Sequence, residues 1–310
     1  MPERFLGIDT SNYTTSGAVF ECGRGITENR KKLLPVKPGE KGLRQSDAVF
    51  HHVRQLPEVL EPLLEEGFDA IGVSNAPRAQ EGSYMPCFLT GANTARLLAG
   101  ALGVPLESFS HQQGHLAAAL YSADKLELLK RPFLAFHVSG GTTEALLVKP
   151  DDRLIPQAEI VACSLDLKAG QAVDRIGVLL GLPFPCGPML EELALQWREK
   201  VSFRPSMKGA DCSLSGIENR CRAMLLAGEP REKVARFCLE AVLASLDAMC
   251  GRLLEDYGKL PVLFSGGVCS NSILRDRLEA VYGAYFAAPE FSSDNAAGIA
   301  VLTKVKRLGL

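Results

Sequence analysis

A pair of short apolar segments joined by a polar turn occurs twice in the sequence, and this repetition constrains the fold more than any other feature. The first copy covers residues 5–20 and the second covers residues 133–148. Each copy predicts two strands connected by a turn of small and hydroxyl residues. The chain therefore contains a duplicated half rather than a short-period repeat.

Strands and helices alternate along much of the remaining chain. Short apolar runs predict strands at 70–73, 104–109 and 262–264, and helical spacing of apolar residues predicts helices at 43–66, 91–102, 112–121, 271–281 and 294–306. Proline and glycine at residues 33–42 predict a loop. Alternation of this kind is typical of an α/β fold with a largely parallel sheet.

Composition excludes several classes of protein. The nine cysteines form no C-x-x-C pair, which argues against a zinc ribbon or a disulfide framework and favours reduced thiols in a cytoplasmic protein. No signal peptide and no run of about 18 apolar residues is found, so we expect no membrane association. The formal net charge is -2, so an RNA contact would need a local basic face or a partner protein.

The turn of the second copy is the strongest candidate binding motif. It reads Val138, Ser139, Gly140, Gly141 and Thr142 between two apolar strands. Adjacent glycines let the backbone approach an anion, and consecutive N–H groups form a nest that binds phosphate. The alternative is a plain hairpin turn, in which Gly-Gly is common.

Two further turns carry similar chemistry. Asp9 ends the first strand and is followed by Ser11 and other hydroxyl residues. This arrangement could bind a phosphate or its magnesium ion. Alternatively, these side chains only cap the local backbone of the turn. Gly266 and Gly267 follow a buried strand. Because they lack side chains, they would admit a base or a phosphate, and Asn271 could bond to an edge of the base. Alternatively, the two glycines only allow close packing of a strand–helix connector.

Histidine spacing suggests a metal site. His111 and His115 lie one helical turn apart, which suits one divalent ion, although this spacing also arises by chance. His51 and His52 are interpreted as features of a helix surface.

Asp294 precedes an apolar helix and is explained on its own as an N-cap. Asp174 could bond ribose hydroxyls or pair with a neighbouring cation.

These motifs, taken in order, resemble the TsaD/Gcp family of tRNA threonylcarbamoyladenosine transferases, once described as O-sialoglycoprotein endopeptidases. The resemblance rests on segments that cover nearly the whole chain, namely residues 7–11, 111–115, 138–143, 170–188, 265–271 and 293–297. It implies an actin-like ATPase (ASKHA) fold with two lobes around a nucleotide cleft. We place the N-terminal lobe at residues 1–110, with the C-terminal helix of about 294–310 packing back on it, and the C-terminal lobe at residues 111–293.

The resemblance also implies roles for particular residues. His111, His115 and Asp294 would bind one divalent metal, iron or zinc. Asp9, Ser11 and Thr142 are the catalytic candidates. The adenine nucleotide, as ATP, ADP or an acyl-AMP, with or without magnesium, would contact Val138, Ser139, Gly140, Gly141, Thr142, Asp174, Gly187, Glu191, Gly266, Gly267 and Asn271.

The sequence departs from the family pattern near the reacting groups. Asn12, Tyr13 and Thr14 replace an acidic stretch, Thr142 replaces a histidine, and Cys186 interrupts a proline–glycine turn. The chain therefore resembles a divergent paralogue. Two hypotheses follow: a carbamoyl-type transferase that acts on tRNA with partner proteins, or a non-catalytic nucleotide-binding paralogue that regulates a true family member. A homodimer, or a heterodimer with a related actin-like protein, is compatible with either; a protease is not supported.

Overall fold

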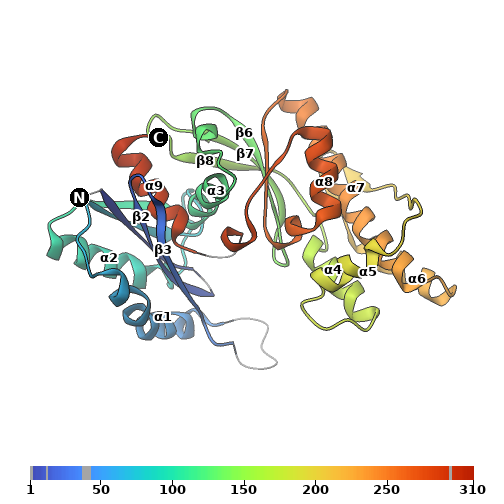
Figure 1. Ribbon diagram of the computed structural model, residues 1–310, viewed down its shortest axis with the longest axis horizontal. Coiled ribbons are helices and arrows are strands. Elements are labelled where there is room, and N and C mark those ends of the chain that lie inside the picture. The colour runs from blue at the N-terminus through green and yellow to red at the C-terminus, as the bar shows by residue number, and fades with distance from the viewer. Residues whose placement is uncertain (1–2, 12, 37–42, 293–294) are drawn as a thin grey trace. The chain divides into compact units, whose positions relative to one another are not determined.

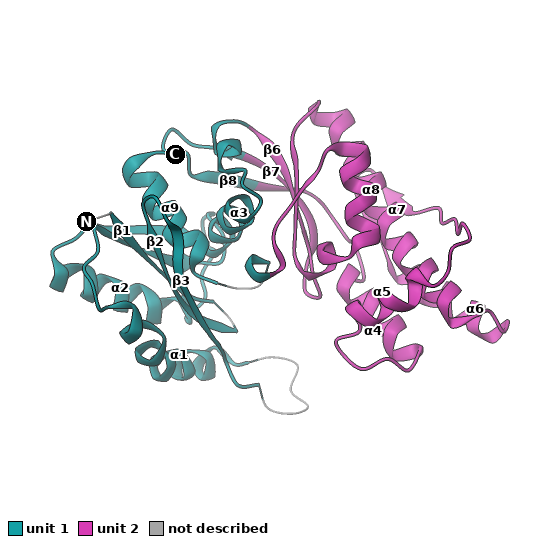
Figure 2. Cartoon of the chain, viewed as in Figure 1, with its two compact units in different colours: residues 1–131, 149–158, 290–310 teal, residues 132–148, 159–289 magenta. Residues whose placement is uncertain are grey.

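Two five-stranded sheets organise the chain (Figure 1). A computed structural model describes residues 3–11, 13–36, 43–292 and 295–310. The chain divides into unit 1, with residues 1–131, 149–158 and 290–310, and unit 2, with residues 132–148 and 159–289 (Figure 2). Each unit contributes its own core, and each is described by itself below.

The sheet of unit 1 has the strand order β3-β2-β1-β4-β5. Its strands are β1 (Arg4–Thr10), β2 (Thr14–Glu21), β3 (Gly25–Leu33), β4 (Ala70–Ala76) and β5 (Leu106–Ser110). β1 pairs antiparallel with β2 and parallel with β4. β2 pairs antiparallel with β3, and β4 pairs parallel with β5. The first predicted strand pair is therefore β1–β2, at the centre of this sheet.

Helices cover the sheet of unit 1. They are α1 (Gln45–Leu60), α2 (Phe88–Leu102), α3 (His111–Ser122) and α9 (Ala297–Leu308), with short 3-10 helices η1 (Glu61–Leu63), η2 (Leu126–Lys130) and η4 (Pro289–Phe291). Leu6 and Ile8 of β1 join a core with residues of α1 and α2. α9 packs against β1, β2 and β4, and α3 packs against α9. Since side chains alternate along a strand, Asp9 faces away from the core that Ile8 enters.

The second sheet has the order β12-β11-β6-β7-β8. Its strands are β6 (Phe133–Val138), β7 (Thr143–Pro150), β8 (Pro156–Cys163), β11 (Val262–Ser265) and β12 (Tyr285–Phe286), and β9 (Ser206–Lys208) pairs separately with β10 (Asp211–Ser213). β6 pairs antiparallel with β7 and parallel with β11, as β1 does with β2 and β4. The two sheets thus share one topology around their predicted strand pairs.

The helices of unit 2 pack on this sheet and on one another. They are α4 (Ala169–Leu179), α5 (Gly187–Leu195), α6 (Ser215–Leu226), α7 (Arg231–Tyr257), α8 (Ser272–Tyr282) and the 3-10 helix η3 (Gly267–Ser270). Phe136, Phe264 and Phe286 stack across adjacent strands at centroid distances of 4.6 and 5.3 Å. They lie in one buried cluster with α4, α7 and α8, so the strand ends of unit 2 rest on a rigid base.

The sequence predicted the α/β class and the duplicated half, and both are confirmed. β3 and β8 were not predicted. Helix α1 continues through Pro57 and ends at Leu60. Residues 111–131 group with unit 1, whereas the predicted boundary placed them in the C-terminal lobe; the packing of α3 against α9 accounts for this grouping. No helix in the described part of the chain is long and apolar enough to cross a membrane.

Candidate functional site

The first group of candidate residues lies in unit 1, at the carboxyl end of β1. Asp9 is fully buried. Its Oδ1 atom accepts a hydrogen bond from the Ser74 hydroxyl of β4 and lies 2.9 Å from Nδ1 of His111. A carboxylate can only accept, so the Nδ1 atom of His111 carries a hydrogen, and in the neutral imidazole its Nε2 atom then carries the lone pair.

Helix α3 presents its two histidines from its first turns. Ser110 caps the helix through a capping box with Gln113, which fixes the start of the helix at His111. His115 follows one turn later, and the two Nε2 atoms are 2.9 Å apart. His111 is about one-fifth exposed, so the pair lies at an accessible edge of the buried Asp9.

The histidine pair fits a divalent metal ion. Two ring nitrogens that each lie about 2.0–2.1 Å from one ion are about 2.9–3.4 Å apart when the ligand angle is roughly 90–110°. The observed 2.9 Å lies in this range, and it is also the length of an ordinary hydrogen bond between the two rings. Asp9 occupies the position of the carboxylate that commonly orients a ligating histidine from behind. Asp294, the third predicted ligand, lies outside the described residues, within which no cluster of three potential ligands is found.

Ser11 is held by a histidine that the sequence analysis placed on a helix surface. His52 is fully buried, and its Nε2 atom lies 2.8 Å from the carbonyl oxygen of Ser11. That interpretation of His52 was wrong, because α1 turns this position toward β2. Burial lowers the pKa of His52, against the opposing effects of its bond to Ser11 and the charge of Asp9.

The second group of candidates lies in unit 2, where the turn between β6 and β7 is closed by hydrogen bonds between its own residues. The N–H of Ser139 donates to the carbonyl of Thr142 at 2.7 Å, and the N–H of Thr142 donates to the Ser139 hydroxyl at 3.1 Å. Gly170 of α4 packs directly on this turn: a Cβ atom there would lie 2.6 Å from the nitrogen of Gly140. Glycine is therefore required at 170 for the helix to approach the turn.

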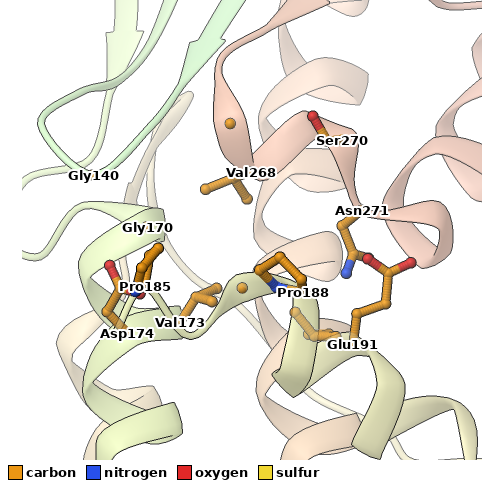
Figure 3. A pocket seen from close by; sticks show the side chains of 13 residues that line it. Gly140, Gly170, Val173, Asp174, Pro185, Pro188, Glu191, Val268, Ser270 and Asn271 are labelled. Carbon is orange, nitrogen blue, oxygen red and sulfur yellow. The ribbon is translucent and has the colours of Figure 1, made fainter. Parts of the chain in front are cut away.

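A cavity of about 440 Å³ opens beside this turn (Figure 3). This volume is in the range of small-molecule sites. It is lined by residues from the turn, from α4 and α5, from α7 and from the β11–α8 connection: Gly140, Gly170, Val173, Asp174, Pro185, Gly187, Pro188, Glu191, Leu239, Gly267, Val268, Ser270 and Asn271.

The cavity brings together six of the predicted nucleotide contacts, which are Gly140, Asp174, Gly187, Glu191, Gly267 and Asn271. The other five, Val138, Ser139, Gly141, Thr142 and Gly266, are not among its lining residues. Val138 is buried in β6. Gly266 packs on it with a φ of +96°, and a Cβ atom there would lie 2.3 Å from the carbonyl oxygen of Val138. Thr142 belongs to unit 2, whereas Asp9 and Ser11 belong to unit 1.

Three polar residues of the cavity also hold its walls. One carboxylate oxygen of Asp174 accepts from the N–H of Cys186 at 2.9 Å. Glu191 accepts from the N–H of Ser272 at 2.8 Å, and Asn271 caps α8 by accepting from the N–H of Leu274 at 3.3 Å. Figure 3 shows Glu191 and Asn271 side by side at one end of the cavity. The polar side chains that we expect to contact a ligand therefore also hold the walls of the cavity in place.

Sequence reasoning did not find the apolar lining. Val173, Leu239 and Val268 offer aliphatic surface of the kind that a flat base packs against. Leu239 lies in the N-terminal half of α7, where its spacing is that of an ordinary core residue, so the sequence carries no signal that could distinguish it. Val173 and Val268 lie beside predicted contacts and could have been included on that ground.

The sequence matches a known protein family. Residues 31–301 match the family described as TsaD, tRNA N6-adenosine threonylcarbamoyltransferase. This match covers most of the chain and includes both histidines of α3, the turn of unit 2 and the β11–α8 connection.

Solved structures share the fold at low sequence identity. Component A of (R)-2-hydroxyglutaryl-CoA dehydratase from Acidaminococcus fermentans has a TM-score of 0.54 and 16% identity, covering 98% of this chain and 99% of that chain. An activator of 2-hydroxyisocaproyl-CoA dehydratase from Clostridium difficile, with bound ADPNP, has a TM-score of 0.52 and 12% identity, covering 98% of this chain and 96% of that chain.

HypF in a phosphate- and nucleotide-bound form has a TM-score of 0.59 and 13% identity, and the match covers 99% of this chain but 46% of that chain. The chain thus spans about half the length of HypF. At these identities the similarity concerns the fold alone, which is the actin-like ATPase fold that the sequence predicted.

Proposed function

The chain belongs to the TsaD family, and from this premise we propose that it transfers a threonylcarbamoyl group from an acyl adenylate to an adenosine of tRNA. One observation carries the proposal beyond family membership: buried Asp9 fixes His111 so that its Nε2 atom points toward that of His115. In the neutral imidazole this tautomer leaves the lone pair on Nε2 of His111, which is the atom that would bind a metal ion.

His111 and His115 would hold a divalent ion, with Asp9 orienting His111 from behind. When bound, such an ion supplies Lewis-acid polarisation of a carbonyl oxygen. The Ser74 hydroxyl donates to the same carboxylate oxygen of Asp9, which restrains the orientation of that carboxylate toward the imidazole.

In unit 2, the cavity would hold the adenosine part of the acyl adenylate. Val173, Leu239 and Val268 would pack against the base, and the N–H groups of Gly140 and Gly141 would bind the phosphate. In the transfer, the adenosine amino nitrogen forms a bond to the carbamoyl carbon. The bond from that carbon to the phosphate oxygen breaks, AMP leaves with the electron pair, and the nitrogen loses one proton to the medium.

The test is a modification assay with purified protein, threonylcarbamoyl-AMP and tRNA, with and without partner proteins, read by mass spectrometry of the digested nucleosides. We expect weak product from the chain alone, because the acids at 12–14 are missing, and more product with partners. His111→Ala should abolish the product, and His51→Ala, on helix α1, is the control.

The second candidate is a non-catalytic paralogue that binds the nucleotide and regulates another protein. The absence of acidic side chains at residues 12–14 favours it. It would replace the first proposal if AMP binds but no product forms under any of these conditions.

A further inference from the structure

The buried face of α1 carries two polar side chains in an otherwise apolar row. His52 is fully buried and Gln55 is 6% exposed, beside Leu56, Val59 and Leu60. A buried polar group destabilises the fold unless it is hydrogen-bonded. Both side chains are bonded, and their partners all lie in the strands β2 and β3 and at the end of β1.

His52 connects the two sides of the segment that joins β1 to β2. Its Nε2 atom lies 2.8 Å from the Ser11 carbonyl oxygen, and its Nδ1 atom lies 2.8 Å from the Thr15 hydroxyl. Because a carbonyl only accepts, the hydrogen of the ring must be on Nε2. The imidazole therefore donates to Ser11 and fixes the direction of its carbonyl.

Gln55 makes comparable bonds that do not reach Ser11. Its Oε1 atom lies 2.8 Å from the Thr15 hydroxyl, whose one hydrogen is shared between this oxygen and Nδ1 of His52, and its Nε2 atom donates to the Leu33 carbonyl at 3.0 Å. It therefore ties β2 to the end of β3. Both side chains lie on α1, both are buried and both contact Thr15. Only His52 also contacts the end of β1.

Three successive residues at the end of β1 are each held by a different element. Asp9 is bonded to Ser74 of β4 and to His111 of α3. Thr10 donates to the Cys87 carbonyl at 3.0 Å, at the start of α2. Ser11 is held by His52 of α1. The two residues that follow Asp9 are thus each anchored to a helix, and both anchors restrain the part of the chain that carries the Asp9 carboxylate.

We infer that His52 is a positioning residue, which fixes Ser11 and thereby the end of β1 that carries Asp9. The inference rests on the proposed function, since Asp9 and Ser11 are catalytic candidates only within it. Misplacing a catalytic group by about 1 Å can reduce a rate by as much as about 100-fold. A contact that fixes the backbone two residues from Asp9 is therefore expected to affect the chemical step.

Two substitutions separate this role from simple support of the fold. In His52→Gln the side-chain amide can take the place of Nε2–H and still donate to Ser11. In His52→Asn the shorter amide takes the place of Nδ1, keeps the Thr15 contact and cannot reach Ser11. Gln55→Leu is the matched control, because it removes a buried polar side chain from the same network but leaves the Ser11 contact.

We expect His52→Asn to lower kcat roughly tenfold or more with KM little changed, and His52→Gln to recover most of the loss. Gln55→Leu should lower the melting temperature about as much as His52→Asn while kcat stays near that of the wild type. Equal loss of kcat in all three variants, in proportion to their melting temperatures, would overturn the inference.

Hydrogen exchange of the peptide covering residues 10–16 gives a readout that does not need activity. Faster exchange in His52→Asn, but not in His52→Gln or Gln55→Leu, supports the role of His52 even if the wild type transfers nothing. That combination would reject the proposed function alone. Unchanged exchange in folded His52→Asn would reject the positioning role whatever the activity.

Discussion

The turns of the two equivalent strand pairs are held in place by different kinds of contact. The end of β1 in unit 1 is held by side chains, with Asp9 bonded to Ser74 and His111 and with Ser11 bonded to His52. The β6–β7 turn in unit 2 is held by bonds within the turn itself, one backbone bond and one to the Ser139 hydroxyl, and by the close approach of Gly170 to Gly140. The strands on either side have the same order and directions in both sheets.

This difference indicates that the two turns, although they belong to copies of one topology, have different functions. Side chains with fixed tautomers and a buried charge suit the positioning of reacting groups and a metal ion. Exposed backbone N–H groups beside glycine and an apolar cavity suit the binding of a nucleotide. Substitutions in one turn should therefore change functions that substitutions in the other leave intact.

The largest effect is expected for His111→Ala. Loss of a ligating imidazole should remove the bound metal and reduce transfer by at least about 100-fold, while AMP binding in unit 2 stays unchanged. Metal analysis of the purified variant and the nucleoside assay measure the two effects. His51→Ala should behave as the wild type; unaltered metal content in His111→Ala would disprove the metal assignment.

Asp9→Asn comes next. The amide keeps the shape of the side chain but loses the negative charge that orients His111, and loss of such an outer partner typically costs about 10- to 100-fold in metal affinity or activity. Metal titration of the apo protein measures this directly. If the variant binds metal as tightly as the wild type, Asp9 does not act through His111.

A smaller effect is expected for Gly170→Ala. The added Cβ atom would lie 2.6 Å from the nitrogen of Gly140, so the turn must shift, which should destabilise the fold by about 1–3 kcal/mol. AMP affinity should fall about tenfold, equivalent to about 1.4 kcal/mol. Gly216→Ala in α6 is the control, because a Cβ atom there meets nothing within 4 Å.

The smallest predicted effect concerns pH. Burial lowers the pKa of His52 from 6.5, and His51 adds to the lowering, while the bond to Ser11 and the charge of Asp9 oppose it. Folded His52 therefore binds fewer protons than the unfolded side chain, so the free energy of unfolding should fall as the pH drops below about 6.5. Denaturant unfolding at pH 7.5 and pH 5.5 should show a weaker pH dependence in His52→Gln; an identical dependence would contradict this prediction.

Sequence patterns predicted the strand pairs, the histidine pair and the glycine turns because each rests on local spacing. They did not predict His52, whose burial depends on which face of α1 meets β2. They also did not predict β3, which is largely exposed and polar along its length, or Leu239, whose place in the cavity depends on the packing of α7. Contacts between distant segments have no local signal.

The central claim is that the two turns have separate tasks, and calorimetric titration of AMP tests it most directly. The wild type and Asp9→Asn should bind AMP with the same affinity within about twofold, a difference below about 0.5 kcal/mol, and Gly170→Ala should bind more weakly. If the wild type gives no binding heat, or if Asp9→Asn weakens AMP binding as much as Gly170→Ala does, this claim is contradicted.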